Sequence, residues 1–167
     1  MKITLREVKT GETAEALILL ANQRDMPTKK AGWNFTWRTL AKVEGAMVYK
    51  LVTVERPEEL EGLVMLTLID QEMLYLNNVE VAPHNYGSDG KYDHVAGGLL
   101  AFGCYKSFEL GRNYYVGYLS FESKTRLIDL YQLKYGATLA MGQKMFFDPV
   151  AGKRLMKEYL AIDLEEE

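Results

Sequence analysis

The stretch that decides the fold reads LYLNNVEVAP (residues 74–83), HNYGSDGKYDH (84–94), VAGGLLAFGCYKSFELG (95–111) and RNYYVGYL (112–119). These pieces predict, in order, a strand, a glycine-bearing loop, a helix and a second strand. The first N–H groups of a helix have no partner within it and carry partial positive charge, so that backbone alone can hold a phosphate there. We therefore interpret the start of this helix, at Val95, as a candidate anion site.

The composition is that of a globular domain. The chain has 167 residues, which suits one domain, and its hydrophobic fraction of 48% is enough for a full core. The net charge of −3 argues against a nucleic-acid partner, which needs a basic face, although a local basic patch would not show in this average. We expect a cytoplasmic protein without a membrane span, because no apolar run reaches roughly 18 residues and the first residues lack the apolar core of a signal peptide.

Cysteine and histidine are scarce. Cys104 is the only cysteine, which excludes an internal disulfide and a multi-cysteine zinc site. Its place on the apolar stripe of the helix favours a buried structural thiol over a nucleophile. The two histidines, His84 and His94, give little material for a metal site, and we expect no metal.

The first half of the chain predicts short strands and helices. Alternating apolar and polar residues predict a strand at residues 2–8. Ala14, Leu17, Ile18 and Ala21 recur at helical spacing and predict a helix over residues 13–22. The next elements are expected at residues 34–42 (helix), 47–54, 62–69 and 73–82 (strands). Short links between the last three favour an antiparallel meander.

The second half continues the same kind of domain. Gly111 ends the central helix, and the crossover predicts that strand 113–121 is a parallel neighbour of strand 73–82. The remaining elements are expected at residues 124–134 (helix), 137–140 and 144–147 (strands), and from Pro149 onward (helix). With no repeat and no linker in view, we predict one α/β domain with a twisted, mixed, mostly antiparallel sheet and helices on both faces.

Several short motifs along the chain together point to a known family. They are VEVAP (79–83), VAGGLLAFG (95–103), Ser123, Tyr131 and then Tyr135-Gly136-Ala137. In this order they resemble the GNAT superfamily of N-acetyltransferases, over about residues 62–147. The resemblance implies the GNAT fold, in which acetyl-CoA binds where two neighbouring strands splay apart. It divides the domain into residues 1–72 (N-terminal strands and acceptor-side helices), 73–122 (cofactor-binding core) and 123–167 (C-terminal helix, strands and last helix).

The resemblance also implies cofactor-binding residues. The family's pyrophosphate loop has the form Gln/Arg-x-x-Gly-x-Gly/Ala, and the best register here is Lys91 to Ala96. Lys91 would supply the positive charge, and His94 replaces the central glycine. For Ser123, a plain helix cap is the alternative. The full implied set is Val79, Val81, Lys91, His94, Val95, Ala96, Gly97, Gly98, Ser123 and Lys124.

Tyr131 is similar in position to the family's tyrosine that protonates the departing thiolate of CoA. A phenol with a pKa of about 10 is a proton donor at neutral pH, and a thiolate of comparable basicity can share its proton. The spacing to Tyr135-Gly136 is one residue longer than the commonest form, which leaves Tyr135 as a rival. A core tyrosine is the alternative interpretation of Tyr131.

Acyl transfer to an amine needs a neutral nitrogen, so a base must take a proton directly or through water. Glu80, just before the expected splay, is the candidate, with a solvated strand glutamate as the alternative. The aromatic residues Trp33, Phe35 and Trp37 fall where the family builds its acceptor pocket. We take Trp33 and Phe35 as acceptor-binding candidates, with core packing as the alternative for two of the three.

The hypothesis that follows is an acetyl-CoA-dependent N-acetyltransferase acting on a primary amine by direct attack in a ternary complex. The alternatives are a non-catalytic CoA-binding protein on the same fold and a protein-interaction module that forms a homodimer. The sequence leaves open the acceptor amine, the acyl chain length, and whether the enzyme is active.

Overall fold

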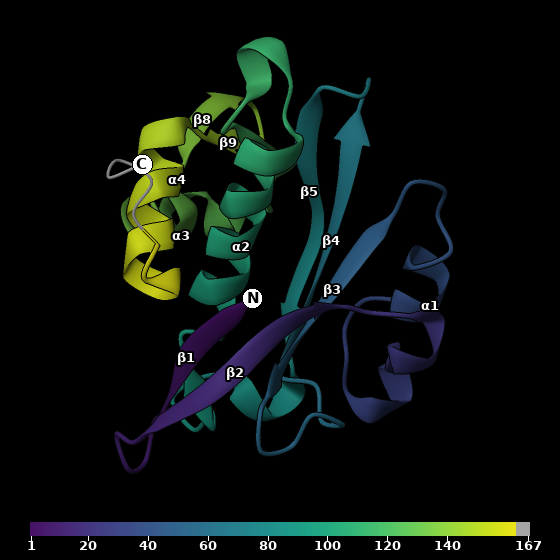
Figure 1. The fold of residues 1–167 in the computed structure, drawn as a ribbon, viewed down its shortest axis with the longest axis vertical. Helices are drawn as coiled ribbons and strands as arrows, with labels where there is room; N and C mark the ends of the chain where they lie inside the picture. Colours follow the sequence, from purple (N-terminus) through teal and green to yellow (C-terminus); the bar gives the residue numbers. More distant parts are fainter. Residues whose placement is uncertain (163–167) are drawn as a thin grey trace. The chain divides into compact units, whose positions relative to one another are not determined.

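A computed structural model describes residues 1–162, coloured along the chain in Figure 1. Residues 163–167, which the predicted C-terminal part includes, lie outside the described residues. Strands in the described part form one sheet in the order β6-β1-β2-β3-β4-β5-β7-β9-β8. β5 and β7 pair in parallel, whereas β1–β2, β1–β6, β2–β3, β7–β9 and β8–β9 pair antiparallel. The mixed, mostly antiparallel sheet of the prediction is confirmed.

The strands are β1 (Lys2–Glu7), β2 (Thr13–Leu20), β3 (Met47–Thr53), β4 (Gly62–Ile69), β5 (Met73–Val81), β6 (Tyr92–Asp93), β7 (Leu119–Glu122), β8 (Thr138–Met141) and β9 (Lys144–Phe147). The helices are α1 (Trp37–Leu40), α2 (Val95–Leu110), α3 (Ile128–Leu133) and α4 (Pro149–Leu155), which a π-helical turn continues to Leu160. No helix within residues 1–162 has both the length and the apolar character that crossing a membrane requires.

The chain groups into two compact units. Unit 1 comprises Met1–Met65 and Asn78–Leu99, and unit 2 comprises Leu66–Asn77 and the residues from Leu100 onward. The boundaries fall inside β4, β5 and α2, so each of these elements contributes to both units. The division of the chain at residues 72 and 122 stays a prediction.

In unit 1, the helix predicted over residues 13–22 is wrong, because Thr13–Leu20 forms strand β2. The turn between β1 and β2 places Gly11 at φ 73°, and Arg6 then lies opposite Thr13 in an antiparallel hairpin. β2 also pairs with β3, from Ala16–Thr53 to Leu20–Tyr49. Ala16 and Ile18 are buried in the alternating pattern of a strand, but the apolar residues between and after them hide this alternation in the sequence.

In unit 2, the strand predicted at residues 113–121 begins later, as β7 at Leu119. Asn113 and Gly117 have φ values of 55° and 85°, which are incompatible with an extended strand. Residues 113–115 form a 3₁₀ turn instead. Gly103 of α2 faces β7 so closely that an added Cβ would lie 2.9 Å from Leu119 Cδ2. Glycine here lets the helix lie close against the strand.

The predicted splay concerns β5 and β7, whose pairing is short. The parallel ladder joins Leu74 to Leu119 and Tyr75 to Ser120. Beyond Tyr75, β5 runs on to Val81, and beyond Ser120, β7 runs on to Glu122. The ladder therefore ends before either strand does.

Candidate functional site

Glu80, near the end of β5, is a buried carboxylate that accepts four hydrogen bonds. Its Oε2 accepts from the N–H of Asn34 at 2.6 Å and from the hydroxyl of Tyr86 at 2.8 Å. Its Oε1 accepts from the N–H of Phe35 at 3.2 Å and from the indole N–H of Trp37 at 2.8 Å. Only 6% of Glu80 is exposed. A carboxylate offers about four lone-pair positions, so these four donors use all of its accepting capacity.

This arrangement bears on the predicted role of Glu80 as general base. A base must accept a proton from the reacting amine, directly or through one water. In the structure, the lone pairs of Glu80 are directed to donors from the segment 34–37 and from Tyr86. The geometry favours a positioning role for Glu80, in which its carboxylate fixes the aromatic segment against the loop that follows β5.

Tyr86 is the part of this cluster that comes from the loop. Burial and the hydrogen bond to Glu80 raise the pKa of Tyr86 to about 12. The phenol therefore stays protonated at neutral pH and continues to donate to Glu80. Its oxygen also accepts from Nδ2 of Asn34 at 3.0 Å. Tyr86 and Asn34 are thus joined both directly and through Glu80.

The aromatic residues of the predicted acceptor pocket divide into two groups. Trp33 and Trp37 are buried in a core cluster of unit 1. Phe35 is half-buried and meets the ring of Trp37 edge-on, with centroids 6.1 Å apart. The core-packing alternative thus describes the two tryptophans. The helix predicted at residues 34–42 is the single turn α1, because Asn34 and Phe35 direct their N–H groups to Glu80 instead of joining it.

The loop after β5 is held by hydrogen bonds of Asn85 near its start and by strand pairing of β6 near its end. Asn85 is buried, donates to the carbonyl of Glu61 at 3.1 Å and accepts from the N–H of Tyr92 at 2.9 Å. Tyr92 and Asp93 form β6, which pairs with Glu7 and Arg6 of β1. The sequence did not predict β6, because two residues are too few to show an alternation pattern.

The start of α2 has the backbone shape that the sequence register implies. His94, which stands in place of the family's central glycine, has φ 72°, in the left-handed region that favours glycine. The first helical bond runs from the N–H of Gly98 to the carbonyl of His94 at 2.9 Å. The N–H groups of Val95, Ala96 and Gly97 therefore have no partner within the helix.

Substitutions at His94 should report the strain of this conformation. We expect His94→Val to be less stable than His94→Gly by about 1–2 kcal/mol, because a left-handed residue with a β-branched side chain crowds its own carbonyl. Urea unfolding of the two variants measures the difference. Equal stabilities would mean that the loop does not hold this conformation in solution.

Other predicted cofactor residues lie near these elements. Val79 and Val81 flank Glu80 on β5 and are half-buried, and the ammonium of Lys91 lies 5.1 Å from the ring centre of Tyr92. In unit 2, the buried hydroxyl of Ser123 donates to the carbonyl of Lys124 at 2.9 Å. A helix cap must accept a hydrogen bond from the first N–H groups of the helix. The alternative interpretation of Ser123 as a helix cap is therefore wrong.

Tyr131, on α3 of unit 2, lies against β7 where that strand has left β5. Its ring centre is 4.9 Å from that of Phe121, the residue after the last paired position of β7, and 6.2 Å from that of Tyr135. Burial, and after it the neighbouring Tyr135, raise the pKa of Tyr131. Tyr135 is more deeply buried, with 5% of its surface exposed. Of the two tyrosines, Tyr131 is the more accessible.

No protein-family model and no curated protein matches the sequence. The structure is similar to one solved as a KacTA–DNA complex, with a TM-score of 0.62 and 11% identity over 86% of this chain and 99% of that chain. It is also similar to AtaTR bound with AcCoA (TM-score 0.59, 13% identity, 84% and 98% covered). A third is the IAA acetyltransferase from Bacillus cereus ATCC 14579 (TM-score 0.52, 17% identity, 75% and 79% covered).

The chain has the GNAT fold. At these identities the likeness concerns the fold, and it agrees with the resemblance that the motifs of the sequence indicate. The splayed pair that the resemblance expects is β5 with β7, the helix after the loop is α2, and the tyrosine-bearing helix is α3.

Sequence reasoning missed one cluster of polar residues in unit 1 of this GNAT fold. Oε1 of Glu61, at the start of β4, lies 2.6 Å from Nε2 of His84 and accepts from Nδ2 of Asn85 at 3.1 Å. The sequence places His84 in the glycine-bearing loop and indicates no partner for it. The one signal available was a glutamate directly before an apolar strand, and it says nothing about a partner 23 residues away.

Proposed function

We propose that this protein is an acetyl-CoA-dependent N-acetyltransferase that transfers an acetyl group to a primary amine within a ternary complex. The observation that carries the proposal is the parallel ladder of β5 and β7, which ends after two paired positions although both strands continue. Edges of separated strands offer backbone N–H and C=O groups that can pair with an extended ligand. Support also comes from AtaTR, a similar structure that was solved with AcCoA.

The residues present fit the cosubstrate in unit 1. The N–H groups of Val95, Ala96 and Gly97 have no hydrogen-bond partner within α2. A helix terminus of this kind suits a diphosphate. Lys91 precedes them and would add a positive charge, while Gly98 lets α2 lie close against β1, because an added Cβ would lie 2.9 Å from Ile3 Cδ1. We propose that the main chain of Val79 and Val81 pairs with the pantetheine arm. These roles, with those of His94, Ser123 and Lys124, come from the resemblance and are part of the proposal.

The chemistry assigns two tasks to protein groups. The amine must lose a proton before its nitrogen attacks the thioester carbonyl, and the departing sulfur must gain one. For the second task we propose the phenol of Tyr131, whose raised pKa keeps it protonated. For the first we propose water, since the lone pairs of Glu80 are already directed to four donors.

Calorimetric titration with acetyl-CoA tests the proposal, and we expect saturable binding. Lys91→Ala should weaken it about threefold to tenfold, the range that one lost charge contact at a partly exposed site usually brings. Lys42→Ala is the matched control, because Lys42 is an exposed cation that follows α1 and is not part of the loop. Failure of the wild-type protein to bind acetyl-CoA would end the proposal.

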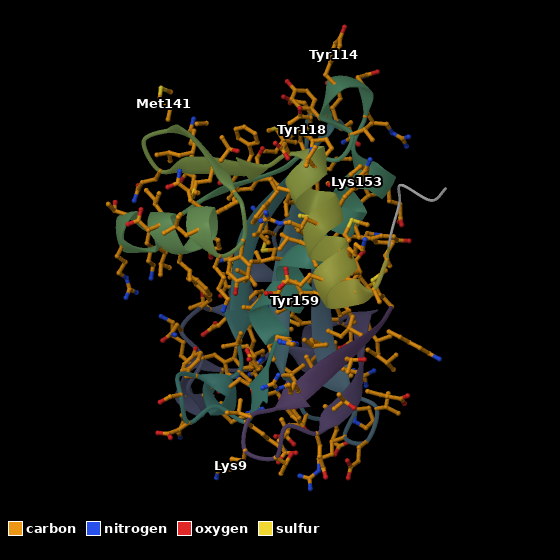
Figure 2. The ribbon with its side chains drawn as sticks, turned by 90° about the vertical axis from the view of Figure 1, so that its left-hand side faces the viewer. Lys9, Tyr114, Tyr118, Met141, Lys153 and Tyr159 are labelled. Atoms are coloured by element: carbon orange, nitrogen blue, oxygen red, sulfur yellow. The ribbon has the colours of Figure 1, made fainter. Side chains whose placement is uncertain are left out.

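Two alternatives to the acetyltransferase are each supported by a separate observation. The occupied carboxylate of Glu80 favours a non-catalytic CoA-binding protein, which would bind acetyl-CoA without turnover on any amine. Exposed apolar side chains of unit 2 favour an interaction module, among them Tyr114 (92% exposed) and Met141 (72%), whose side chains extend from the ribbon in Figure 2. Light scattering at high concentration tests the homodimer. The expectations of a cytoplasmic location and of no nucleic-acid partner stay predictions.

A further inference from the structure

A hollow of about 470 Å³ in unit 1 is lined by residues from three loops. Ala31 and Trp33 come from the segment before α1, Glu58–Leu60 from the link between β3 and β4, and Ala82–His84 from the end of β5. Its volume is within the range of roughly 300–1,000 Å³ that small-molecule sites occupy. A single bare metal ion needs far less space.

Glu61 and His84 form a fixed pair at this hollow. The Glu61 side chain is 1% exposed, while that of His84 is 34% exposed and lines the hollow. Nε2 of His84 faces the carboxylate of Glu61, and we assign it as the donor of this hydrogen bond, because an ionised carboxylate can only accept.

The charges around the hollow favour a cation. Glu58 and Glu59 line it, and no lysine or arginine is among its lining residues in the described chain. Oε1 of Glu59 lies 3.9 Å from Nε2 of His84, so the two groups face the same space. Arg56 reaches Glu59 at 3.8 Å and offsets part of this charge.

An aromatic surface completes the lining. Trp33 belongs both to the core cluster and to the lining of the hollow, and 6% of it is exposed. Indole rings attract ammonium groups, and apolar walls suit the carbon skeleton that carries such a group. Carboxylates beside a wall that includes Trp33 suit an organic ammonium better than an anion.

We infer that the hollow formed by Trp33, Glu58, Glu59 and His84 binds an organic ammonium ion. Resting on the proposed function, we assign this ammonium to the acceptor, so that acceptors are cationic amines of modest size with an apolar portion. Glu61 acts through His84 as a positioning residue, because its buried carboxylate fixes the ring. If Trp33 contacts the acceptor, as the sequence predicts, the acceptor is an ammonium ion.

Calorimetry with the full-length protein, without acetyl-CoA, tests the inference. The matched probes are phenethylammonium and 2-phenylethanol, which differ chiefly in carrying an ammonium or a hydroxyl group. We expect the ammonium to bind about tenfold or more tightly. Glu59→Gln should weaken ammonium binding about threefold to tenfold, as for one partly exposed charge contact. Glu55→Gln, an exposed carboxylate outside the lining, is the control and should leave it unchanged.

The remaining outcomes are distinguishable. Equal binding of both probes, no binding of either, or an unchanged affinity in Glu59→Gln would overturn the inference. The ligating atoms of Glu59, Glu61 and His84 lie within 4.8 Å of one another, so Zn²⁺ is titrated as a second arm. Binding of Zn²⁺ without any binding of the ammonium would also overturn it. Ammonium binding without acetyl-CoA binding would uphold the hollow as a cation site and refute the acetyltransferase.

Discussion

Glu80→Ala should lower the free energy of unfolding by about 3–5 kcal/mol, because it removes the acceptor of four hydrogen bonds from a buried place. Trp37 is fully buried, so its indole N–H cannot turn to water once Glu80 is gone. The N–H groups of Asn34 and Phe35 lose the partner that holds their segment in place. Urea unfolding followed by tryptophan fluorescence measures the loss.

Glu80→Gln separates the role of the acceptor atoms from that of the side-chain volume. The amide keeps the shape but can accept at only one of its two ends, so donors at the other end meet an NH₂ group. We expect a loss of about 1–3 kcal/mol, smaller than for alanine. Glu15→Gln, an exposed glutamate on β2, is the control and should change stability by less than about 0.5 kcal/mol. Wild-type stability in Glu80→Ala would contradict the positioning role.

The sequence predicted best where one local pattern decides the element. The bounds of β4 (Gly62–Ile69) and α2 (Val95–Leu110) agree with the prediction, because an apolar run between turn residues and a glycine-terminated apolar stretch of helical length are both local signals. β2 was mistaken for a helix, because the identity of a central strand depends on neighbours that the local pattern does not show.

The candidate site shows the same limit. The motifs located the loop and the start of α2, and even marked His94 as an unusual residue at a glycine position. They could not show that Glu80 is occupied, because three of its four donors come from residues 34–37, more than 40 positions away. Nor could they show the pair of Glu61 and His84, which only the folding of two separate loops brings together.

Tyr131→Phe should lower kcat about a hundredfold or more and leave the affinity for acetyl-CoA unchanged, since general acids typically contribute 10²–10⁴-fold. The substitution removes one hydroxyl and keeps the ring that packs against Phe121. Because the pKa of Tyr131 is raised, its proton should be retained up to its ordinary value of about 10, and any fall in rate that Tyr131 causes should begin only above that pH. Steady-state kinetics from pH 7 to pH 10, together with calorimetry, measure these effects.

Tyr135→Phe is the matched control, because Tyr135 is the neighbouring tyrosine and the rival donor. Its ring is nearly buried, so we expect that loss of its hydroxyl changes stability more than kcat. If Tyr135→Phe lowers kcat and Tyr131→Phe does not, the donor is Tyr135. If neither variant changes kcat, the leaving sulfur takes its proton from water, and the proposed reaction loses its general acid while the binding of acetyl-CoA stands.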